Sequence, residues 1–323
     1  MRNFLTNSME KPKLSIIVLS LNTKKLLMEC LDSLKRVRKE INFEVIVVDN
    51  GSTDGTVAML RNFQFPRLRR DFGGQAFFNF QFIENKKNLG FAAGNNKARP
   101  YCRGKYILFL NSDTTLPKGT LKEMVSYMEK NPQVGAATCK ILLPGGSLDK
   151  DARRAFITPW IGLTHLYLKL DRIFPKSKLF AKYWYGYIPD NKIHEVDALQ
   201  GAFFLSPKKV LDKVGWFDED YFLDGEDIDL SWRIKEQGYK VMYYPMVSIL
   251  HKKGASKGKV GSATKKRVPI DLRLRHRMAG VNSMEIFYRK HLWSRYPLIF
   301  NIFVLAGIKT LKGIRYIRTL VLG

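Results

Sequence analysis

Short, unbroken apolar runs alternate with segments of helical periodicity through the first half of the chain. The runs are rich in β-branched residues, as strands buried on both faces are. They cover residues 14–21, 43–50, 80–85, 106–111 and 134–143. The segments between them carry apolar residues at helical spacing, as Leu27, Leu31 and Leu34 do. This alternation predicts an α/β fold with a mostly parallel central sheet and helices on both faces.

The alternation stops near Pro144. From 144 to 195, glycine, proline and aromatic residues follow no period, and we interpret this segment as an inserted, aromatic-rich lobe. Strand and helix patterns resume after it. The predicted organisation is a polar N-terminal tail (1–13), a main domain (14–250), a basic loop (251–278) and a helical C-terminal tail (279–323).

The chain is strongly basic, with 55 Lys and Arg against 29 Asp and Glu and a formal net charge of +26. This excess predicts an anionic partner: nucleic acid, acidic lipid headgroups or a phosphorylated small molecule. The sequence contains no recognisable nucleic-acid-binding module, so we expect no nucleic-acid partner. Cys30, Cys102 and Cys139 lie far apart, which argues against a disulfide framework or a zinc site. No apolar run is long enough to predict a signal peptide or a spanning helix.

Polar clusters follow three of the predicted strands. Ser20 and Asn22 follow the first strand, residues 49–54 (DNGSTD) the second and residues 111–113 (NSD) the fourth. In an open parallel sheet, ligands bind outside the carboxyl ends of the strands. Each cluster alone could be a turn or a helix cap, but together they predict a ligand site at one edge of the sheet. A dinucleotide site is excluded, because the turn after the first strand (SLNTKK) has no glycine.

The segment 221–230, YFLDGEDIDL, concentrates acid in a basic chain. Its carboxylates are Asp224, Glu226, Asp227 and Asp229. One or two acids would stabilise a helix N-terminus by about 0.3–1 kcal/mol each. Four acids this close repel one another, which favours a catalytic role over a purely structural one.

Six segments, taken in order, resemble the family 2 glycosyltransferases of GT-A fold, especially the rhamnosyltransferase-like branch that builds bacterial surface polysaccharides. They are LSIIVLSLN, FEVIVVDNGSTDGT, NKKNLGFAAGNNKA, YILFLNSDTTL, VDALQGAFFLSPKKVLDKVGWFDEDYF and GEDIDLSWRIKEQGYKVMYYPMVSILHKKGAS. The resemblance covers about 14–143 and 196–293, and the 144–195 lobe has no counterpart. It implies a GT-A type nucleotide-sugar-binding domain over 14–250, with the lobe on the acceptor side.

The resemblance implies that Asp49 hydrogen-bonds the pyrimidine base of a nucleotide. Glycine allows close backbone approach and a helix N-terminus favours phosphate, which suits Gly90 and the helix that follows it. Helix packing is the alternative explanation for Gly90. The nucleotide-binding residues implied are Ser20, Asn22, Asp49, Asn50, Ser52, Asn88, Gly90, Asn95, Asn111 and Ser112.

Residues 111–113 occupy the position of the family's metal-binding DxD-type motif, but Asn111 replaces the first acid. Asp113 would therefore supply one carboxylate to Mg²⁺ or Mn²⁺, with phosphate and water oxygens completing the shell. His251 lies where the family often has a further metal or phosphate contact, although a lone histidine is commonly structural. Lys252 and Lys253 could lie near the leaving diphosphate, or the basic loop could stay solvated.

The Glu-Asp motif of the family corresponds to residues 226–227, so the resemblance makes Asp227 the catalytic base, with Glu226 and Asp224 orienting the base or the acceptor. Such a base removes the proton of the acceptor hydroxyl as its oxygen attacks the anomeric carbon with inversion. The residues expected beside the donor or acceptor sugar are Gln200, Gly201, Trp216 and Asp218. Trp216 could equally be a core residue.

The implied enzyme moves a sugar from a nucleoside diphosphate donor to a lipid-linked or oligosaccharide acceptor in cell-surface polysaccharide synthesis. We expect dTDP-rhamnose first as donor and a UDP-sugar second. In the tail, cations such as Arg315 alternate with aliphatic residues such as Ile314, which suits an anionic membrane surface. We therefore expect a cytoplasmic, peripheral location on the inner face of the cell membrane. The alternatives are a tail packed on the body and a catalytically retired GT-A scaffold that binds polyanions or membrane.

Overall fold

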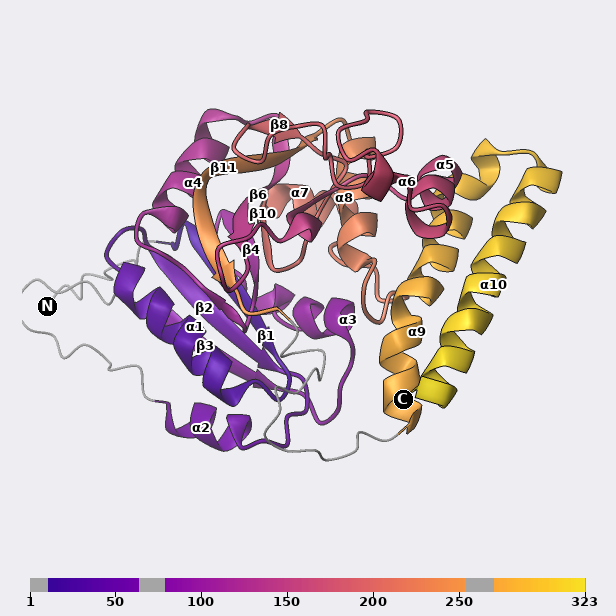
Figure 1. Cartoon of the computed structure of the whole chain (residues 1–323). Helices are drawn as coiled ribbons and strands as arrows, with labels where there is room; N and C mark the ends of the chain where they lie inside the picture. Colours follow the sequence, from indigo (N-terminus) through magenta and orange to yellow (C-terminus); the bar gives the residue numbers. More distant parts are fainter. Residues whose placement is uncertain (1–10, 64–78, 254–269, 323) are drawn as a thin grey trace, which may run out of the picture.

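The computed structural model describes residues 11–63, 79–253 and 270–322. In this part of the chain, one large sheet has the strand order β3-β2-β1-β4-β10-β6-β11-β5, with β8 beside β11 (Figure 1). Its strands are β1 (Leu14–Ser20), β2 (Phe43–Asp49), β3 (Asn79–Glu84), β4 (Tyr106–Asn111), β5 (Thr114–Thr115), β6 (Val134–Leu142), β8 (His194–Glu195), β10 (Phe203–Pro207) and β11 (Lys240–His251). A second sheet pairs β7 (Arg153–Arg154) with β9 (Ala198–Leu199).

Strands β3, β2, β1 and β4 are parallel, and the predicted apolar runs form them. The run at 134–143 forms β6, but β10 lies between β4 and β6 and is antiparallel to both, so the sheet is mostly rather than wholly parallel. The register places Ser20 beside Asp49 and Leu19 beside Asn111. The polar clusters that follow these strands therefore meet at one edge of the sheet, as predicted.

Helices join the strands and pack on the sheet (Figure 1). They are α1 (Lys24–Val37), α2 (Thr56–Asn62), α3 (Phe91–Asn96), η1 (Arg99–Tyr101), α4 (Thr120–Lys130), α7 (Lys208–Val214) and α8 (Glu226–Glu236). The periodic residues Leu27, Leu31 and Leu34 are fully buried on α1, as their spacing predicts. The core also contains Phe109 and Trp216, whose rings meet edge to face with centroids 5.8 Å apart.

The inserted lobe contains only short elements. They are η2 (Lys150–Ala152), α5 (Pro159–Ile161), the π-helix η3 (Gly162–Tyr167) and α6 (Leu170–Ile173). Strand β7 follows η2 in the lobe and its partner β9 lies just beyond the lobe, so this small sheet joins the lobe to the main domain. Inside the lobe, His165 Nδ1 lies 2.9 Å from Asp171 Oδ2.

The C-terminal tail forms a hairpin of two antiparallel helices beside α8, joined by a short turn (Figure 1). Its elements are α9 (Ile270–Phe287), η4 (Tyr288–Leu292), η5 (Trp293–Arg295) and α10 (Leu298–Leu322). Helix α9 begins at Ile270 and so includes the last part of the predicted basic loop. The remainder of that loop, 254–269, and the first ten residues of the predicted N-terminal tail lie outside the described residues.

The tail packs on the body through a second apolar cluster. Trp232 of α8 meets Phe287 of α9 edge to face, and Ile308 of α10 is buried in the same cluster. Ile314 and Ile317 stay 42% and 61% exposed, so only part of the tail packs on the body. Among the described helices, none combines the length and apolar character that a bilayer crossing requires.

Candidate active site

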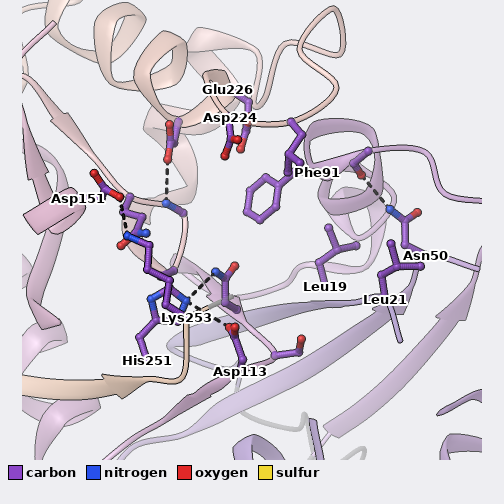
Figure 2. A pocket seen from close by; sticks show the side chains of 18 of the residues that line it. Leu19, Leu21, Asn50, Phe91, Asp113, Asp151, Asp224, Glu226, His251 and Lys253 are labelled. Carbon is purple, nitrogen blue, oxygen red and sulfur yellow. Dashed lines mark hydrogen bonds and ion pairs between the residues drawn. The ribbon is translucent and has the colours of Figure 1, made fainter. Parts of the chain in front are cut away.

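A cavity opens at the carboxyl edge of the sheet, where β1 and β4 end and α8 begins (Figure 2). Several of the predicted site residues line it. They are Asn50, Asn88, Gly90, Asn111, Ser112, Asp113, Gln200, Gly201, Asp224, Glu226, Asp227 and His251. Figure 2 shows Asp224 and Glu226 across the cavity from Asp113 and His251, with the ring of Phe91 between Asn50 and the acidic side. The sheet edge and the acidic segment thus form one site.

Asp49 ends β2 and is completely buried. Its Oδ1 accepts hydrogen bonds from the backbone N–H groups of Gly51 and Ser52, at 3.1 and 2.8 Å. Its Oδ2 is buried and has no hydrogen-bond partner among the described residues. Asp49 does not line the cavity, although a buried, unsatisfied acceptor is costly and a ligand N–H such as that of a pyrimidine base would satisfy it.

Asn50 organises the loop that precedes α3. Its Nδ2 donates to Asn88 Oδ1 and to the Gly90 carbonyl, both at 2.9 Å. Gly90 has φ +87°, and a Cβ there would lie 2.4 Å from the Phe222 carbonyl oxygen. Glycine is therefore required at position 90 by packing against Phe222 as well as by its place in the cavity wall. Phe222 lies in the loop before α8, so this contact is between two loops and not the helix packing considered as the alternative.

The remaining predicted nucleotide residues support the wall without lining this cavity. Asn22, at φ 53°, accepts from the Thr53 N–H at 2.7 Å, and its own N–H donates to Ser52 Oγ. Ser20 is buried and shares a hydrogen bond with the Thr23 hydroxyl. Asn95 is also buried, and its side chain bonds to the backbone of its own helix.

Asp113 and His251 form the opposite wall. His251 Nε2 lies 3.3 Å from Asp113 Oδ1, and its Nδ1 lies 3.1 Å from Asp149 Oδ2. Burial alone would lower the pKa of His251, but the two carboxylates outweigh burial and raise it to about 9. The Lys252 N–H also donates to the Asp113 carbonyl at 2.8 Å, which fixes the end of β11 beside β5.

The donor set allows a divalent ion only with help from the substrate. Asp113 Oδ1 faces His251, whereas its Oδ2 is buried without a hydrogen bond from any described residue and is the oxygen suited to a cation. In the described part of the chain, no group of three or more acidic, His or Cys side chains is placed to hold a metal. Asp113 would therefore share the ion with phosphate and water oxygens, and His251 could bind the ion only after losing the proton that Asp113 and Asp149 favour.

Asp227 lies in the first turn of α8. Its Oδ2 accepts from Arg154 Nη2 at 2.7 Å and from the Gly201 backbone N–H at 3.1 Å. Its Oδ1 is buried and without a hydrogen-bond partner among the described residues. One oxygen is thus held in place while the other remains available to accept a proton, as a general base requires.

Glu226 and Asp224 lie close to Asp227 in sequence and in the cavity wall. Burial raises the pKa of Glu226 well above its ordinary value, and the negative charges of Asp227 and Asp224 raise it further. The backbone at Asp224 and Gly225 has positive φ, 62° and 142°. A Cβ at Gly225 would lie 2.6 Å from the Ser283 side chain, so the loop before α8 reaches α9 closely only because residue 225 is glycine.

Sequence comparisons agree with this geometry. The family model for "Glycosyl transferase family 2" matches residues 15–190, and that for "Glycosyl transferase family group 2" matches residues 106–322. Together they cover the sheet, the acidic segment and the hairpin.

The chain belongs to glycosyltransferase family 2.

Among curated relatives, the O-antigen biosynthesis protein RfbC of Myxococcus xanthus is 28% identical over 248 residues, which are 76% of this chain and 18% of that protein. The N-acetylglucosaminyl-diphospho-decaprenol L-rhamnosyltransferase of Mycobacterium tuberculosis is 27% identical over 227 residues, 67% of this chain and 68% of that protein. The chain thus spans only a small part of the first relative and about two thirds of the second. These two relatives support the predicted assignment of the chain to the rhamnosyltransferase-like branch of the family.

Solved structures confirm the GT-A fold. The mannosyltransferase PcManGT from Pyrobaculum calidifontis, in complex with GDP-Man and Mn²⁺, superposes with a TM-score of 0.54 at 18% identity, covering 96% of this chain and 74% of that one. GalNAc-T7 with UDP, GalNAc and Mn²⁺ has a TM-score of 0.53 at 14% identity, covering 75% and 44%.

The site also contains residues that the sequence did not indicate, and some of them come from the inserted lobe. The Arg154 side chain is 11% exposed and lies against Asp227; burial would lower its pKa, but Asp227 above all raises it. Asp151 and Lys253 also line the cavity, and Lys253 Nζ contacts Asp151 at 2.6 Å and Asp149 at 2.7 Å. Lys253 therefore lies in the cavity wall and is not part of a solvated loop. Lys252 instead pairs with Glu29 on α1.

Of the residues expected beside the sugar, two line the cavity and two do not. Gln200 and Gly201 line the cavity, and Gln200 Oε1 is buried without a hydrogen-bond partner among the described residues. Trp216 is fully buried, and its Nε1 donates to Asp212, so the core interpretation is the correct one. Asp218 pairs with Lys290 of the tail at 2.5 Å and does not line the cavity.

Phe91 and Phe222 are the aromatic residues of this cavity. Phe91 lies in the first turn of α3, and its ring packs edge to face on Phe217 with centroids 5.6 Å apart. A Cβ at Gly201 would lie 2.7 Å from this ring, so glycine at 201 leaves space for it. The NLGF segment could have indicated this aromatic, because its phenylalanine directly follows Gly90.

Proposed function

We propose that this chain is an inverting, divalent-metal-dependent glycosyltransferase that moves a sugar from a nucleoside diphosphate donor to a hydroxyl of a lipid-linked or oligosaccharide acceptor. The observation that carries the proposal is a pair of buried carboxylates in one cavity. Asp113 and Asp227 each have oxygen atoms without a hydrogen-bond partner among the described residues. An acid that binds a cation and an acid that accepts a proton are what this reaction requires.

The two walls of the cavity would have different roles: Asp227 acts on the acceptor, and Asp113 acts on the leaving diphosphate. Asp227 Oδ1 takes the proton of the acceptor hydroxyl while the hydroxyl oxygen forms a bond to the anomeric carbon. The bond from that carbon to the diphosphate oxygen breaks, and the nucleoside diphosphate leaves with the electron pair. Arg154 and the Gly201 N–H hold Asp227 Oδ2 throughout. A divalent ion on Asp113, with His251 beside it, would neutralise the charge that develops on the leaving diphosphate.

The nucleotide would lie along the β1–β2 edge. Asp49 Oδ2 is suited to a base N–H, and Asn50, Asn88 and Gly90 form the wall next to it. These groups bind base and phosphate rather than sugar, so the donor is proposed from similarity. The name of the M. tuberculosis L-rhamnosyltransferase supports rhamnose as the transferred sugar. We therefore propose dTDP-rhamnose first as donor, with a UDP-sugar second. Its name also favours a diphosphate-linked lipid acceptor, which the 144–195 lobe and the hairpin would face.

The setting proposed is cell-surface polysaccharide synthesis at the inner face of the cytoplasmic membrane, with the protein peripheral. Support comes from the similarity to an O-antigen biosynthesis protein and from α10, whose first turns expose large apolar side chains while its later turns carry Lys309, Lys312 and Arg318. Exposed apolar groups beside cations suit an anionic bilayer surface.

The first test is titration calorimetry with dTDP, UDP and GDP, each with and without Mn²⁺. Binding of dTDP or UDP that strengthens with Mn²⁺ is expected, and Asp113→Ala should remove the Mn²⁺-dependent part while binding without Mn²⁺ persists. Asp32→Ala is the matched control, because Asp32 lies on the exposed side of α1 and pairs with Lys35. Absence of nucleotide binding, together with tight binding to anionic vesicles, would favour a retired scaffold instead.

A further inference from the structure

A second cavity, of about 680 Å³, lies between the inserted lobe and the α9–α10 hairpin. Its volume is within the range of roughly 300–1,000 Å³ that is typical of small-molecule sites. Most of its lining is apolar and comes from three segments that are distant in sequence. Representative residues are Leu163 and Leu166 of the lobe, Met284 and Phe287 of α9, and Val304 and Ile308 of α10. The occupant that such a lining favours is apolar.

This cavity adjoins the reaction site. Asp151, Arg154 and Asp224 line both cavities. Arg154 is also the residue that holds Asp227. A substrate whose hydroxyl reaches Asp227 could therefore extend past Arg154 into the second cavity without crossing the protein interior.

The second cavity changes from charged to apolar along its length. Near the reaction site, Arg315 of α10 and Asp224 both lie within 4 Å of the position that a Gly280 Cβ would occupy, at 3.7 and 3.8 Å. Farther along α10 the lining becomes Ile308, Val304 and then Phe303. Because a helix rises 1.5 Å per residue, Phe303 and Arg315 lie roughly 18 Å apart along α10. The expected occupant has a charged head and an apolar chain.

The far end of the cavity opens to solvent across apolar side chains. Phe303 is 70% exposed and Phe300 39%, and Leu163 of the lobe is 45% exposed. Contiguous exposed apolar groups of this size generally mark an interaction surface. A chain longer than the cavity could leave here directly into a bilayer.

We propose that the second cavity binds the proximal part of the lipid chain of a lipid-diphosphate-linked acceptor, with the diphosphate at the Arg154–Arg315 end. This inference rests on the proposed transferase function and adds the position of the lipid. It also gives the lobe and the hairpin a common role, because each forms one wall of the lipid site.

The test uses the full chain and farnesyl diphosphate, a short isoprenoid diphosphate, with inorganic diphosphate as the headgroup control, in calorimetry without detergent. Farnesyl diphosphate should bind about tenfold or more tightly than inorganic diphosphate, because its chain is buried. Val304→Asp should remove that advantage. Val321→Asp is the matched control, since Val321 lies on the same helix, is 73% exposed and is not part of the cavity lining.

A second variant removes the cavity without adding charge. Gly162 has φ −57° and its nearest neighbour to an added Cβ is 3.7 Å away, so Gly162→Phe is compatible with the backbone and fills the space. Gly162→Phe should weaken the binding of farnesyl diphosphate and leave the binding of inorganic diphosphate unchanged. Equal binding of the two diphosphates, or equal weakening by Val304→Asp and Val321→Asp, would overturn the proposal. Nucleotide binding by the same variants separates the two claims: if nucleotide binds and the lipid preference is absent, only the lipid site is wrong.

Discussion

The Arg154 guanidinium reaches from the inserted lobe to within 2.7 Å of Asp227 Oδ2 on α8. Both side chains are largely buried, and the contact leaves Asp227 Oδ1 without a hydrogen-bond partner among the described residues. The expectation that the 144–195 lobe has no counterpart in the family is wrong, because both family models extend into it. A residue of this lobe thus contacts the acidic motif at the start of α8. In the proposed mechanism, the lobe would therefore position Asp227 as well as contact the acceptor.

Replacing Arg154 should impair catalysis more than donor binding. Arg154→Met removes the contact that orients Asp227, and we expect kcat to fall about 10²-fold or more, while the KM for the donor changes little. Arg154→Lys should recover only part of kcat, because an ammonium cannot reproduce the guanidinium geometry. Steady-state kinetics provides both constants.

The neighbouring Arg153 provides the control. Its guanidinium packs over the Tyr243 ring, 5.3 Å from the centroid, on the other side of β7. Arg153→Met should affect stability and leave kcat of the folded protein nearly unchanged. A similar loss of kcat in both variants would mean that the lobe strand, and not the contact with Asp227, is responsible.

Asp227→Asn should nearly abolish transfer. The amide preserves the shape of the side chain but cannot accept the acceptor proton, so a loss of about 10²–10⁴-fold in kcat is expected. Nucleotide binding should persist, because Asp227 lies on the wall opposite Asp113. Product formation measured with a radiolabelled donor, beside calorimetry of the same variant, provides the check. Turnover close to that of the unmodified protein would assign the base to another residue.

Glu226→Gln should increase stability at neutral pH. Burial first, and then Asp227 and Asp224, raise the folded-state pKa of Glu226, so the protein retains a proton there that the unfolded chain releases. The corresponding stability is fully present below the unfolded pKa, about 4.3, and is lost as pH rises toward the folded value. Thermal unfolding should thus show a higher Tm for Glu226→Gln at pH 7 and little difference at pH 4. An equal Tm at both pH values would contradict the raised pKa.

Asp229→Asn should strongly destabilise the protein. Asp229 is completely buried and contacts Arg233 at 2.6 Å and His291 at 2.7 Å. Removing one member of a buried ionic group costs about 3–5 kcal/mol. Burial opposes ionisation, but His291 and Arg233 lower the pKa of Asp229, so its contribution is present above the unfolded pKa and is lost as pH falls.

Urea unfolding at pH 7 and pH 3 measures this effect. The difference between Asp229→Asn and the unmodified chain should be large at pH 7 and smaller at pH 3. Asp32→Asn is the control, because its half-exposed pair with Lys35 is worth roughly 1 kcal/mol or less. A comparable effect from both substitutions would show that the Asp229 contacts are no stronger than a surface pair.

Local sequence patterns predicted the sheet and much of the site for physical reasons. A buried parallel strand needs an unbroken apolar run, so β1, β2 and β4 were recognisable within one or two residues. Residues at the ends of those strands must meet at one edge, which made Asp113 predictable beside the nucleotide loops. Asp227 followed from its motif.

The missed features depend on contacts between distant segments. Arg154 lies in a lobe without periodicity, and only the folded chain brings it to Asp227. The burial of Trp216 likewise depends on Phe109, which is distant in sequence. Strand β10 could be recognised as a strand, but its insertion between β4 and β6 is a property of the whole sheet.

The attachment of the hairpin to α8 limits how this enzyme can be divided. Ser283 Oγ donates to the Leu223 carbonyl at 3.2 Å beside Gly225, and His291 contacts Asp229 on the base-bearing helix. A chain shortened before Ile270 would lose these contacts and leave the apolar surface around Trp232 in water. The minimal catalytic unit therefore includes the hairpin, and a chimera that exchanges this tail between relatives would alter the placement of Asp227 together with any membrane contact.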